Sequence, residues 1–249
     1  MAASSPADST TRSWAAPIGL ACGLGGIAAL AASAAGYRLA WWPLATALSI
    51  AEFAAYAAAL GLVLALVGLA LALRRHAGRG VVLPLLGLVA CLPVVAMAAQ
   101  WVYAARTYPP INDISTDIAD PPVFWDMPTP SEYPGGRTAE LQRAAYPDLG
   151  PLSLALTPER AFTLAQEIAR DNGWEIVAEE PDDGRIEAVA TTLVYGFKDE
   201  IAIRIVPAEG GAVIDLRSRS RLGRSDLGTN AARISRFLAA LQERAGEEN

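Results

Sequence analysis

Four arginines lie within eight residues near the end of the 249-residue chain, in the stretch "DLRSRSRLGRSDLGTN" at residues 215–230. Arg217, Arg219 and Arg221 are two residues apart, and Arg224 follows after a glycine. Guanidinium groups bind phosphate and carboxylate groups through paired N–H donors. Beside the N-terminus of a helix, unpaired backbone N–H groups add to the attraction for an anion. The spacing therefore predicts a turn that binds anions.

The elements around this turn decide which side chains can meet. In an extended segment the side chains alternate, so Ile214 and Leu216 should face a core while the arginines share the opposite face with Asp215. A solvated sheet face crossed by salt bridges would account for Arg217. The residues that converge around the turn and the following helix form the candidate ligand-binding set, which is Arg219, Arg221, Arg224, Asp226, Asn230 and Arg233. The alternative is a structural network of arginines and carboxylates, with Asp226 or Thr229 capping the helix.

Cysteine and histidine chemistry is excluded from most of the chain. Cys22 and Cys91 lie in apolar runs, and the one histidine, His76, lies in a short basic loop. After Arg106 the sequence has neither residue type, which rules out Ser-His-Asp and Cys-His nucleophiles, histidine-bearing zinc sites and haem ligation by histidine there. We expect no metal and no cofactor.

Charge is divided unevenly along the chain. Up to Arg106 there are six basic and two acidic residues, which leaves 14 basic and 24 acidic residues after it. Because a part this acidic is repelled by nucleic acid phosphates, we expect no nucleic-acid partner. An anion site in this part of the chain must therefore be a small region of locally positive charge.

Three apolar runs are each long enough to cross a bilayer, for which about 20 residues suffice. They follow a polar start at residues 1–13, make up a membrane region at 14–106, and lie at 17–36, within 44–73 and at 81–103. Tryptophan and tyrosine at the ends of the runs suit a membrane interface. The small residues of "ALAASAAG" leave open that the first run is a cleaved signal.

The loops predict the orientation of the membrane region. The loop "RRHAGR" carries Arg74, Arg75 and Arg79, whereas the loop between the first two runs carries Arg38 alone. The more basic loop is expected in the cytoplasm, so the rest of the chain lies outside. We expect a multi-pass protein of the bacterial inner membrane with its C-terminal domain in the periplasm.

Residues 107–150 have the composition of a connector rich in proline and aspartate. Asp113, Asp117 and Asp120 could supply oxygen ligands to calcium, but the segment lacks the spacing and the glycine of a calcium loop. Turns formed by Asx and Ser/Thr side chains explain these residues more simply.

Residues 151–249 predict a soluble α+β domain. Thr157 is a good N-cap, Pro158 fits the first helical position, and Gly173 suits the end of that helix. Four strands are predicted at 174–180, 185–197, 200–207 and 212–220, followed by a helix at 225–244. This order indicates a four-stranded antiparallel sheet with two helices on one face.

The stretches "PPINDISTDIADPPVF" and "DLRSRSRLGRSDLGTNAARISRFL" together resemble the family known as domain of unknown function 1499, in the branch with an N-terminal membrane region. The resemblance covers the chain from about Tyr108 onward. It implies the fold and the placement of the domain, and it implies no reaction, because the family has no established activity.

Three functions remain open. The first is a non-enzymatic membrane protein whose outer domain binds an anionic small molecule or a partner protein through the arginine-rich turn. The second is an envelope hydrolase or transferase acting on a phosphate-bearing substrate, with Ser225 and Asp226 at its centre. The third is a structural subunit of a membrane complex, suggested by Gly19 and Gly23 in the first apolar run.

Overall fold

The computed structural model describes residues 14–75 and 78–247. The predicted polar segment 1–13 and His76 lie outside these residues. The chain forms two compact units, Met1–Val102 and Tyr103–Asn249. Because the boundary falls inside the third helix, the last turn of that helix belongs to the C-terminal unit.

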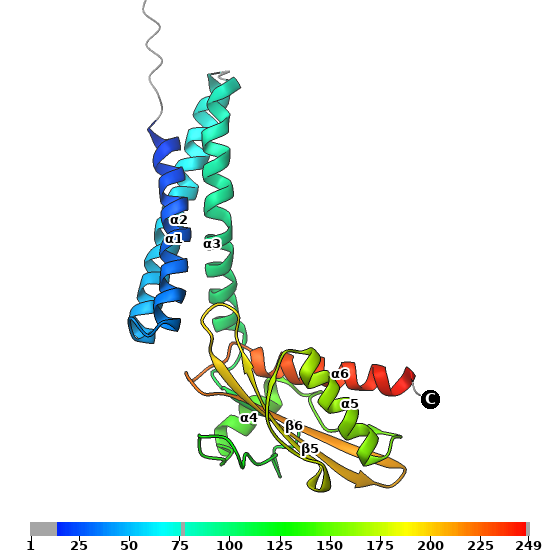
Figure 1. The fold of residues 1–249 in the computed structure, drawn as a ribbon. Coiled ribbons are helices and arrows are strands. Elements are labelled where there is room, and N and C mark those ends of the chain that lie inside the picture. Colours follow the sequence, from blue (N-terminus) through cyan, green and yellow to red (C-terminus); the bar gives the residue numbers. More distant parts are fainter. Residues whose placement is uncertain (1–13, 76–77, 248–249) are drawn as a thin grey trace, which may run out of the picture. The chain divides into compact units, whose positions relative to one another are not determined.

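The N-terminal unit is helical (Figure 1). Its elements are α1 (Ala15–Arg38), α2 (Leu44–Arg74), the 3₁₀ turn η1 (Gly78–Val81) and α3 (Val82–Thr107). The three α-helices have 24, 31 and 26 residues, with mean hydropathies of 1.8, 2.4 and 2.4 in their most apolar windows. At about 1.5 Å per residue each is long enough to span a hydrocarbon core of about 30 Å. The expectation of three helices of membrane-spanning length is confirmed.

Small residues let these helices approach closely. A Cβ atom at Gly19 would lie 2.9 Å from the carbonyl oxygen of Gly61 on α2, and one at Gly23 would lie 2.8 Å from Cβ of Ala90 on α3. The absence of these side chains allows tight helix contacts. The glycines that suggested an external helix partner are therefore used for packing within this chain.

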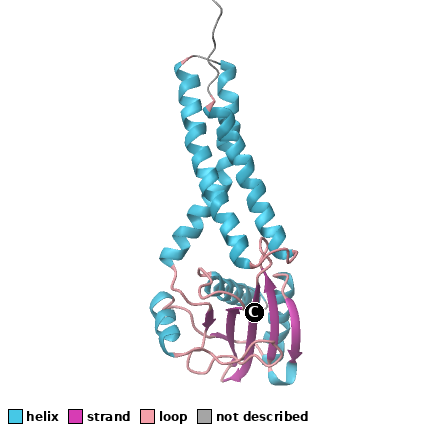
Figure 2. Cartoon of the chain, turned by 90° about the vertical axis from the view of Figure 1, so that its left-hand side faces the viewer, coloured by secondary structure: helices cyan, strands magenta, loops and turns pink. Residues whose placement is uncertain are grey.

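The C-terminal unit is an antiparallel sheet with helices (Figure 2). Its elements, in chain order, are β1 (Asp113–Ser115), α4 (Gly136–Ala145), β2 (Leu152–Leu154), α5 (Pro158–Asp171), β3 (Glu175–Glu180), the 3₁₀ turn η2 (Pro181–Asp183), β4 (Arg185–Thr191), β5 (Lys198–Ala208), β6 (Gly211–Ser220) and α6 (Thr229–Glu247). The strand order is β1-β6-β5-β4-β3, and β2 also pairs with β6. The α+β class is confirmed, but the sheet has six strands rather than four, and α4 adds a helix.

The two unpredicted strands are short and depend on β6. In β1, Ile114 pairs with Ser218, and in β2, Ser153 pairs with Val213. Three residues carry too little alternation to identify a strand from the sequence. Their extended conformation is stabilised by hydrogen bonds to the free edge of β6.

The main core lies between the sheet and the helices α5 and α6. Ile214 and Leu216 of β6 are fully buried in it, as their predicted alternation requires. Trp174 stacks on Phe237 of α6 with ring centroids 5.2 Å apart. At the start of α5, the hydroxyl oxygen of Thr157 accepts a hydrogen bond from the backbone N–H of Arg160 at 3.3 Å, which confirms the predicted cap.

The predicted strand 185–197 was wrong at its C-terminal end. β4 stops at Thr191, and residues 192–197 form the β4–β5 loop. The backbone N–H of Thr192 donates to the carbonyl of Phe197, and the N–H of Phe197 donates back to the hydroxyl of Thr192. Gly196 has a φ of +69°, which glycine adopts without strain. This closed turn ends the strand although the sequence is apolar.

The face of the sheet opposite the helices is covered. Residues 122–133, called the covering segment below, pass over it, and Phe124 and Met127 pack there against Val189 and Ala202. The expectation of a solvated face around Arg217 was wrong, because this side chain is only 1% exposed. Part of the connector covers this face, and the alternation of side chains along a strand could not predict that.

Candidate functional site

Arg217 uses all five of its N–H donors inside the domain. Its Nε and Nη2 atoms donate to the two carboxylate oxygens of Asp113 at 2.9 and 2.8 Å. The remaining donors reach the carbonyl oxygens of Pro122, Ser131 and Glu132. A guanidinium with every donor satisfied and almost no exposure cannot hold a ligand, so Arg217 fixes the covering segment to β6.

Arg219 is held in a similar way on the same face. Its Nε donates to Glu200 at 2.8 Å, and its terminal nitrogens donate to Thr129 and to the carbonyl of Pro130. The guanidinium lies 4.1 Å from the ring centroid of Phe124, within the range of a cation–π contact. Arg219 is therefore part of the same internal network.

Arg221 shares the carboxylate of Glu200 with Arg219. Its Nε donates to the second oxygen of Glu200 at 2.8 Å, and its side chain is 25% exposed. Burial alone would raise the pKa of Glu200, but hydrogen bonds from Thr129, Arg219 and Arg221 outweigh it and lower that pKa below its usual value. One negative charge thus faces two positive charges, which leaves a net positive charge at the exposed end.

Arg224 and Lys198 extend this positive charge. The backbone N–H of Arg221 donates to the carbonyl of Lys198 at 3.1 Å, so these two residues are neighbours across β6 and β5. The turn is fixed by Asn112, whose amide donates to the carbonyl of Gly223 at 2.8 Å. Arg224 and Lys198 are exposed, and among residues 14–75 and 78–247 neither has an ion-pair partner. We call Lys198, Arg221 and Arg224 the cationic rim.

Asn230 and Arg233 lie on the opposite, helix-covered side of the sheet. The amide of Asn230 donates to the carbonyl of Asn112 at 3.0 Å, and its oxygen accepts from Ser218 at 2.8 Å. Arg233 donates to Asp199 at 2.6 Å and to Ser218 at 2.9 Å. Both side chains are buried and tie α6 to the sheet.

Asp226 occupies the N-terminus of α6. Its two carboxylate oxygens accept from the backbone N–H groups of Gly228 and Asn230 at 2.9 and 2.8 Å. Burial raises the pKa of Asp226, these hydrogen bonds oppose the rise, and the charge of Asp199 adds to it. The capping alternative weighed for this residue is what the geometry shows. The carboxylate takes the place in which an anion would bind the helix end.

The six candidate residues therefore divide among three environments. Arg221 is partly exposed and Arg224 is exposed in the turn after β6, whereas Arg219 is buried under the covering segment. Asp226, Asn230 and Arg233 belong to the packing of α6. Lys198 was missed by sequence reasoning. Its signal would have been the pairing of the first residue of β5 with the end of β6, which requires the strand register.

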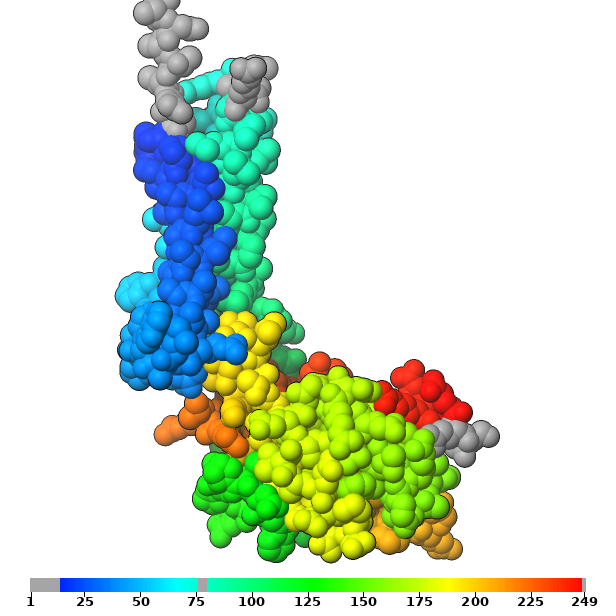
Figure 3. Space-filling model, viewed as in Figure 1, coloured from blue at the N-terminus to red at the C-terminus, as the bar shows by residue number. Residues whose placement is uncertain are grey.

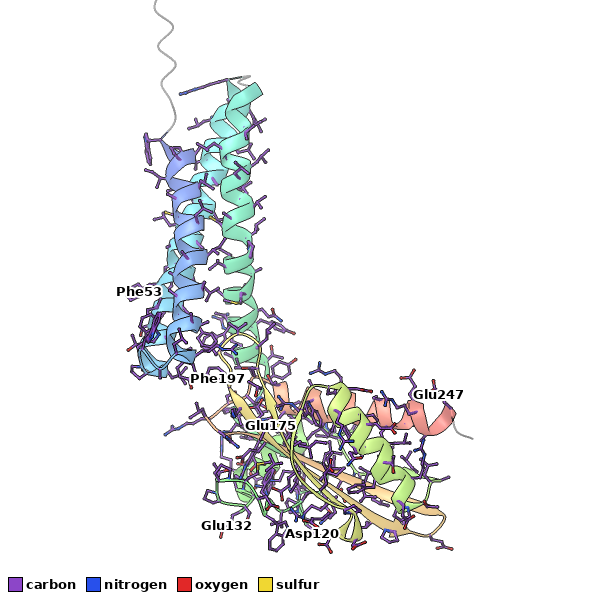
Figure 4. The ribbon with its side chains drawn as sticks, in the orientation of Figure 1. Phe53, Asp120, Glu132, Glu175, Phe197 and Glu247 are labelled. Carbon is purple, nitrogen blue, oxygen red and sulfur yellow. The ribbon has the colours of Figure 1, made fainter. Side chains whose placement is uncertain are left out.

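Apolar side chains are exposed beside the cationic rim. Leu193 and Val194 in the β4–β5 loop are 89% and 48% exposed, and Leu222 is 50% exposed. In Figure 3 the loop (yellow) and the turn after β6 (orange) lie at the surface on the same side of the C-terminal unit. Figure 4 marks this end of the sheet by Phe197 and the distant end by Asp120.

The acidic residues of the connector serve as ion-pair partners. Asp113 pairs with Arg217, and Asp117 and Asp120 lie 3.6 and 2.7 Å from Arg204. Within the part of the chain that the structure describes, no group of three or more His, Cys, Asp or Glu side chains could hold a metal ion. The simpler interpretation of these aspartates as structural residues agrees with their contacts.

A cleft of about 570 Å³ lies beside the covering segment. It is lined in part by Trp125, Arg185 and Arg204. Arg185 donates to Asp126 and Glu187, each at 2.7 Å, and Arg204 donates to Asp120 and Asp215. Because these cations are already neutralised, the cleft is a weaker anion site than the cationic rim.

Comparison with known proteins agrees with the resemblance noted in the sequence. No match is found among curated proteins. The sequence pattern of a family described as "Protein of unknown function (DUF1499)" matches residues 113–241, which run from β1 into α6. The match covers more than half of the chain and includes the covering segment, the ion-pair network and the cationic rim. The chain therefore belongs to the DUF1499 family.

Proposed function

We propose that this chain is a non-enzymatic membrane protein whose C-terminal domain binds an anionic ligand or partner through the cationic rim. One observation carries the proposal: two guanidinium groups, Arg219 and Arg221, pair with the single carboxylate of Glu200, which compensates only one of their two positive charges. The excess charge lies at the surface, where Arg224 and Lys198 add to it. Arg219 positions Glu200 and through it Arg221.

The geometry of the rim suits phosphate or carboxylate recognition. Arg221 donates its Nε to Glu200, and within residues 14–75 and 78–247 its terminal nitrogens make no hydrogen bond, so they can donate to another group. Charge-assisted hydrogen bonds contribute about 1.5–3 kcal/mol each. The backbone of the turn that carries Arg221 and Arg224 is fixed by the hydrogen bond from Asn112 to Gly223 before a ligand arrives, which reduces the entropy lost on binding.

The contacts around Ser225 favour binding over hydrolysis. The hydroxyl of Ser225 accepts from the N–H of Leu227 at 3.3 Å, and both oxygens of Asp226 accept from backbone N–H groups. A nucleophile needs a base within hydrogen-bond reach, and Asp226 is committed elsewhere. The enzymatic alternative therefore has less support than the binding function.

Binding of pyrophosphate tests the proposed function. We expect the full chain in an uncharged detergent to bind pyrophosphate in equilibrium dialysis, and Arg224→Ala to raise the Kd about tenfold or more through loss of one charge-assisted contact. Arg236→Ala is the matched control, since Arg236 is exposed on α6 and its Nε donates only to its own helix. The proposal would be contradicted if both substitutions weakened pyrophosphate binding equally, or if the wild type did not bind pyrophosphate.

We also propose that the domain lies in the periplasm of a bacterial cell, with α1, α2 and α3 in the inner membrane. The support is the larger number of arginines between α2 and α3 than between α1 and α2. Alkaline phosphatase fused after Asn249 should be active, because it folds only after export. A fused fluorescent protein that matures only in the cytoplasm and is bright would contradict this orientation.

A further inference from the structure

The cationic rim lies at the end of the domain where the chain leaves α3. The last turn of α3 belongs to the C-terminal unit. Five residues after Thr107, the carbonyl of Asn112 accepts a hydrogen bond from the N–H of Ser220 at 2.9 Å. Five residues span at most about 18 Å. The rim is therefore within a short distance of the end of a membrane-spanning helix.

Packing around Tyr108 confirms this closeness within the C-terminal unit. A Cβ atom at Gly228 would lie 2.7–2.9 Å from the ring of Tyr108, so the turn after β6 packs on the residue that follows α3. The N–H of Asp226 donates to the carbonyl of Ile111 at 3.1 Å. The turn cannot move far from the helix end without breaking these contacts.

The chemical character of this end is that of a surface that meets a bilayer. Leu193, Val194 and Leu222 are exposed apolar side chains in the two segments, 191–198 and 220–225, that carry the three cations of the rim. The segments 191–198 and 220–225 contain no acidic residue, although the chain as a whole has a net formal charge of −6. Exposed apolar groups flanked by Lys and Arg bind the interface of membranes that contain anionic lipids.

We propose that this end of the domain docks on the membrane that holds α1, α2 and α3. The cationic rim binds phosphates of anionic phospholipids, and Leu193, Val194 and Leu222 enter the layer between headgroups and acyl chains. The inference rests on the proposed function and names its ligand as a lipid headgroup rather than a free phosphate. Each basic residue close to an anionic bilayer strengthens attachment about fivefold.

Amide hydrogen exchange of the full chain in nanodiscs tests the docking. We expect the amides of residues 192–198 and 220–225 to exchange about tenfold more slowly in discs that contain phosphatidylglycerol than in discs of phosphatidylcholine alone. The variant with Lys198→Glu and Arg224→Glu should lose this lipid dependence. Arg236→Glu, matched in charge change per site, should keep it.

The outcomes separate docking from anion binding in general. Equal exchange in the two kinds of disc, together with rim-dependent binding of pyrophosphate, would overturn the docking and leave a free anion as the ligand. Equal exchange without pyrophosphate binding would overturn the proposed function as well. Lipid dependence that survives in the double variant would show that the rim is not the contact.

Discussion

Replacing Arg217 by methionine should lower the free energy of unfolding of the C-terminal unit by about 3–5 kcal/mol. The substitution leaves the carboxylate of Asp113 buried without its partner, and it removes donors from the carbonyls of Pro122, Ser131 and Glu132. Pulse proteolysis of the full chain across a urea series measures the change, because cleavage reports the unfolded C-terminal unit.

Two further variants show whether the buried charge is the cause. Adding Asp113→Leu to Arg217→Met should recover part of the loss, because removing both partners leaves no unpaired charge. Arg170→Met removes an exposed pair with Glu179 and should cost less than about 1 kcal/mol. A loss for Arg217→Met as small as that for Arg170→Met would contradict the anchoring role.

Glu200→Gln should destabilise the domain by about 3 kcal/mol at neutral pH, because three hydrogen bonds, from Thr129, Arg219 and Arg221, lose their ionic acceptor. The pKa of Glu200 is lowered in the folded state, where hydrogen bonds from Thr129, Arg219 and Arg221 exceed the effect of burial. Its stabilisation is therefore present above the unfolded pKa of about 4.3 and is lost as the pH falls through the lower folded value. Urea unfolding at several pH values should show the wild-type advantage over Glu200→Gln shrinking in that acidic range.

The same substitution has the opposite effect on the rim. Glu200→Gln removes the negative charge that partly compensates Arg221, so the cationic rim becomes more positive. We expect Glu200→Gln to bind pyrophosphate more tightly, by about fivefold or more, while it is less stable. A variant that is both less stable and weaker in binding would indicate that Glu200 only positions Arg221.

Local patterns predicted much of the fold. The three apolar runs identified α1, α2 and α3, and the cap at Thr157 placed the start of α5. Alternation along β6 placed Leu216 in the core and the arginines on the other face. These features depend on residues that are neighbours in sequence, so the sequence contains the physical information they need.

Features that depend on residues far apart in the sequence could not be predicted. β1 and β2 exist because the edge of β6 accepts them, and the covering segment is held by donors about 90 residues away, as in the contact between Arg219 and Thr129. Asp113 lies 104 residues before Arg217, its ion-pair partner. From the sequence alone, buried and free arginines in this turn could not be told apart, because the carboxylates that select among them come from other strands.

The most direct test of the account is the reactivity of individual arginines toward phenylglyoxal, read by mass spectrometry on the intact, folded chain. Of the five arginines at 217, 219, 221, 224 and 233, Arg224 should react fastest and Arg221 more slowly. Burial and ion pairs should protect the other three, Arg217, Arg219 and Arg233. Pyrophosphate, and a bilayer with phosphatidylglycerol, should each slow the reaction of Arg224. Rapid modification of Arg217 and Arg219, or an Arg224 rate unaffected by either anion, would contradict the division between internal network and cationic rim.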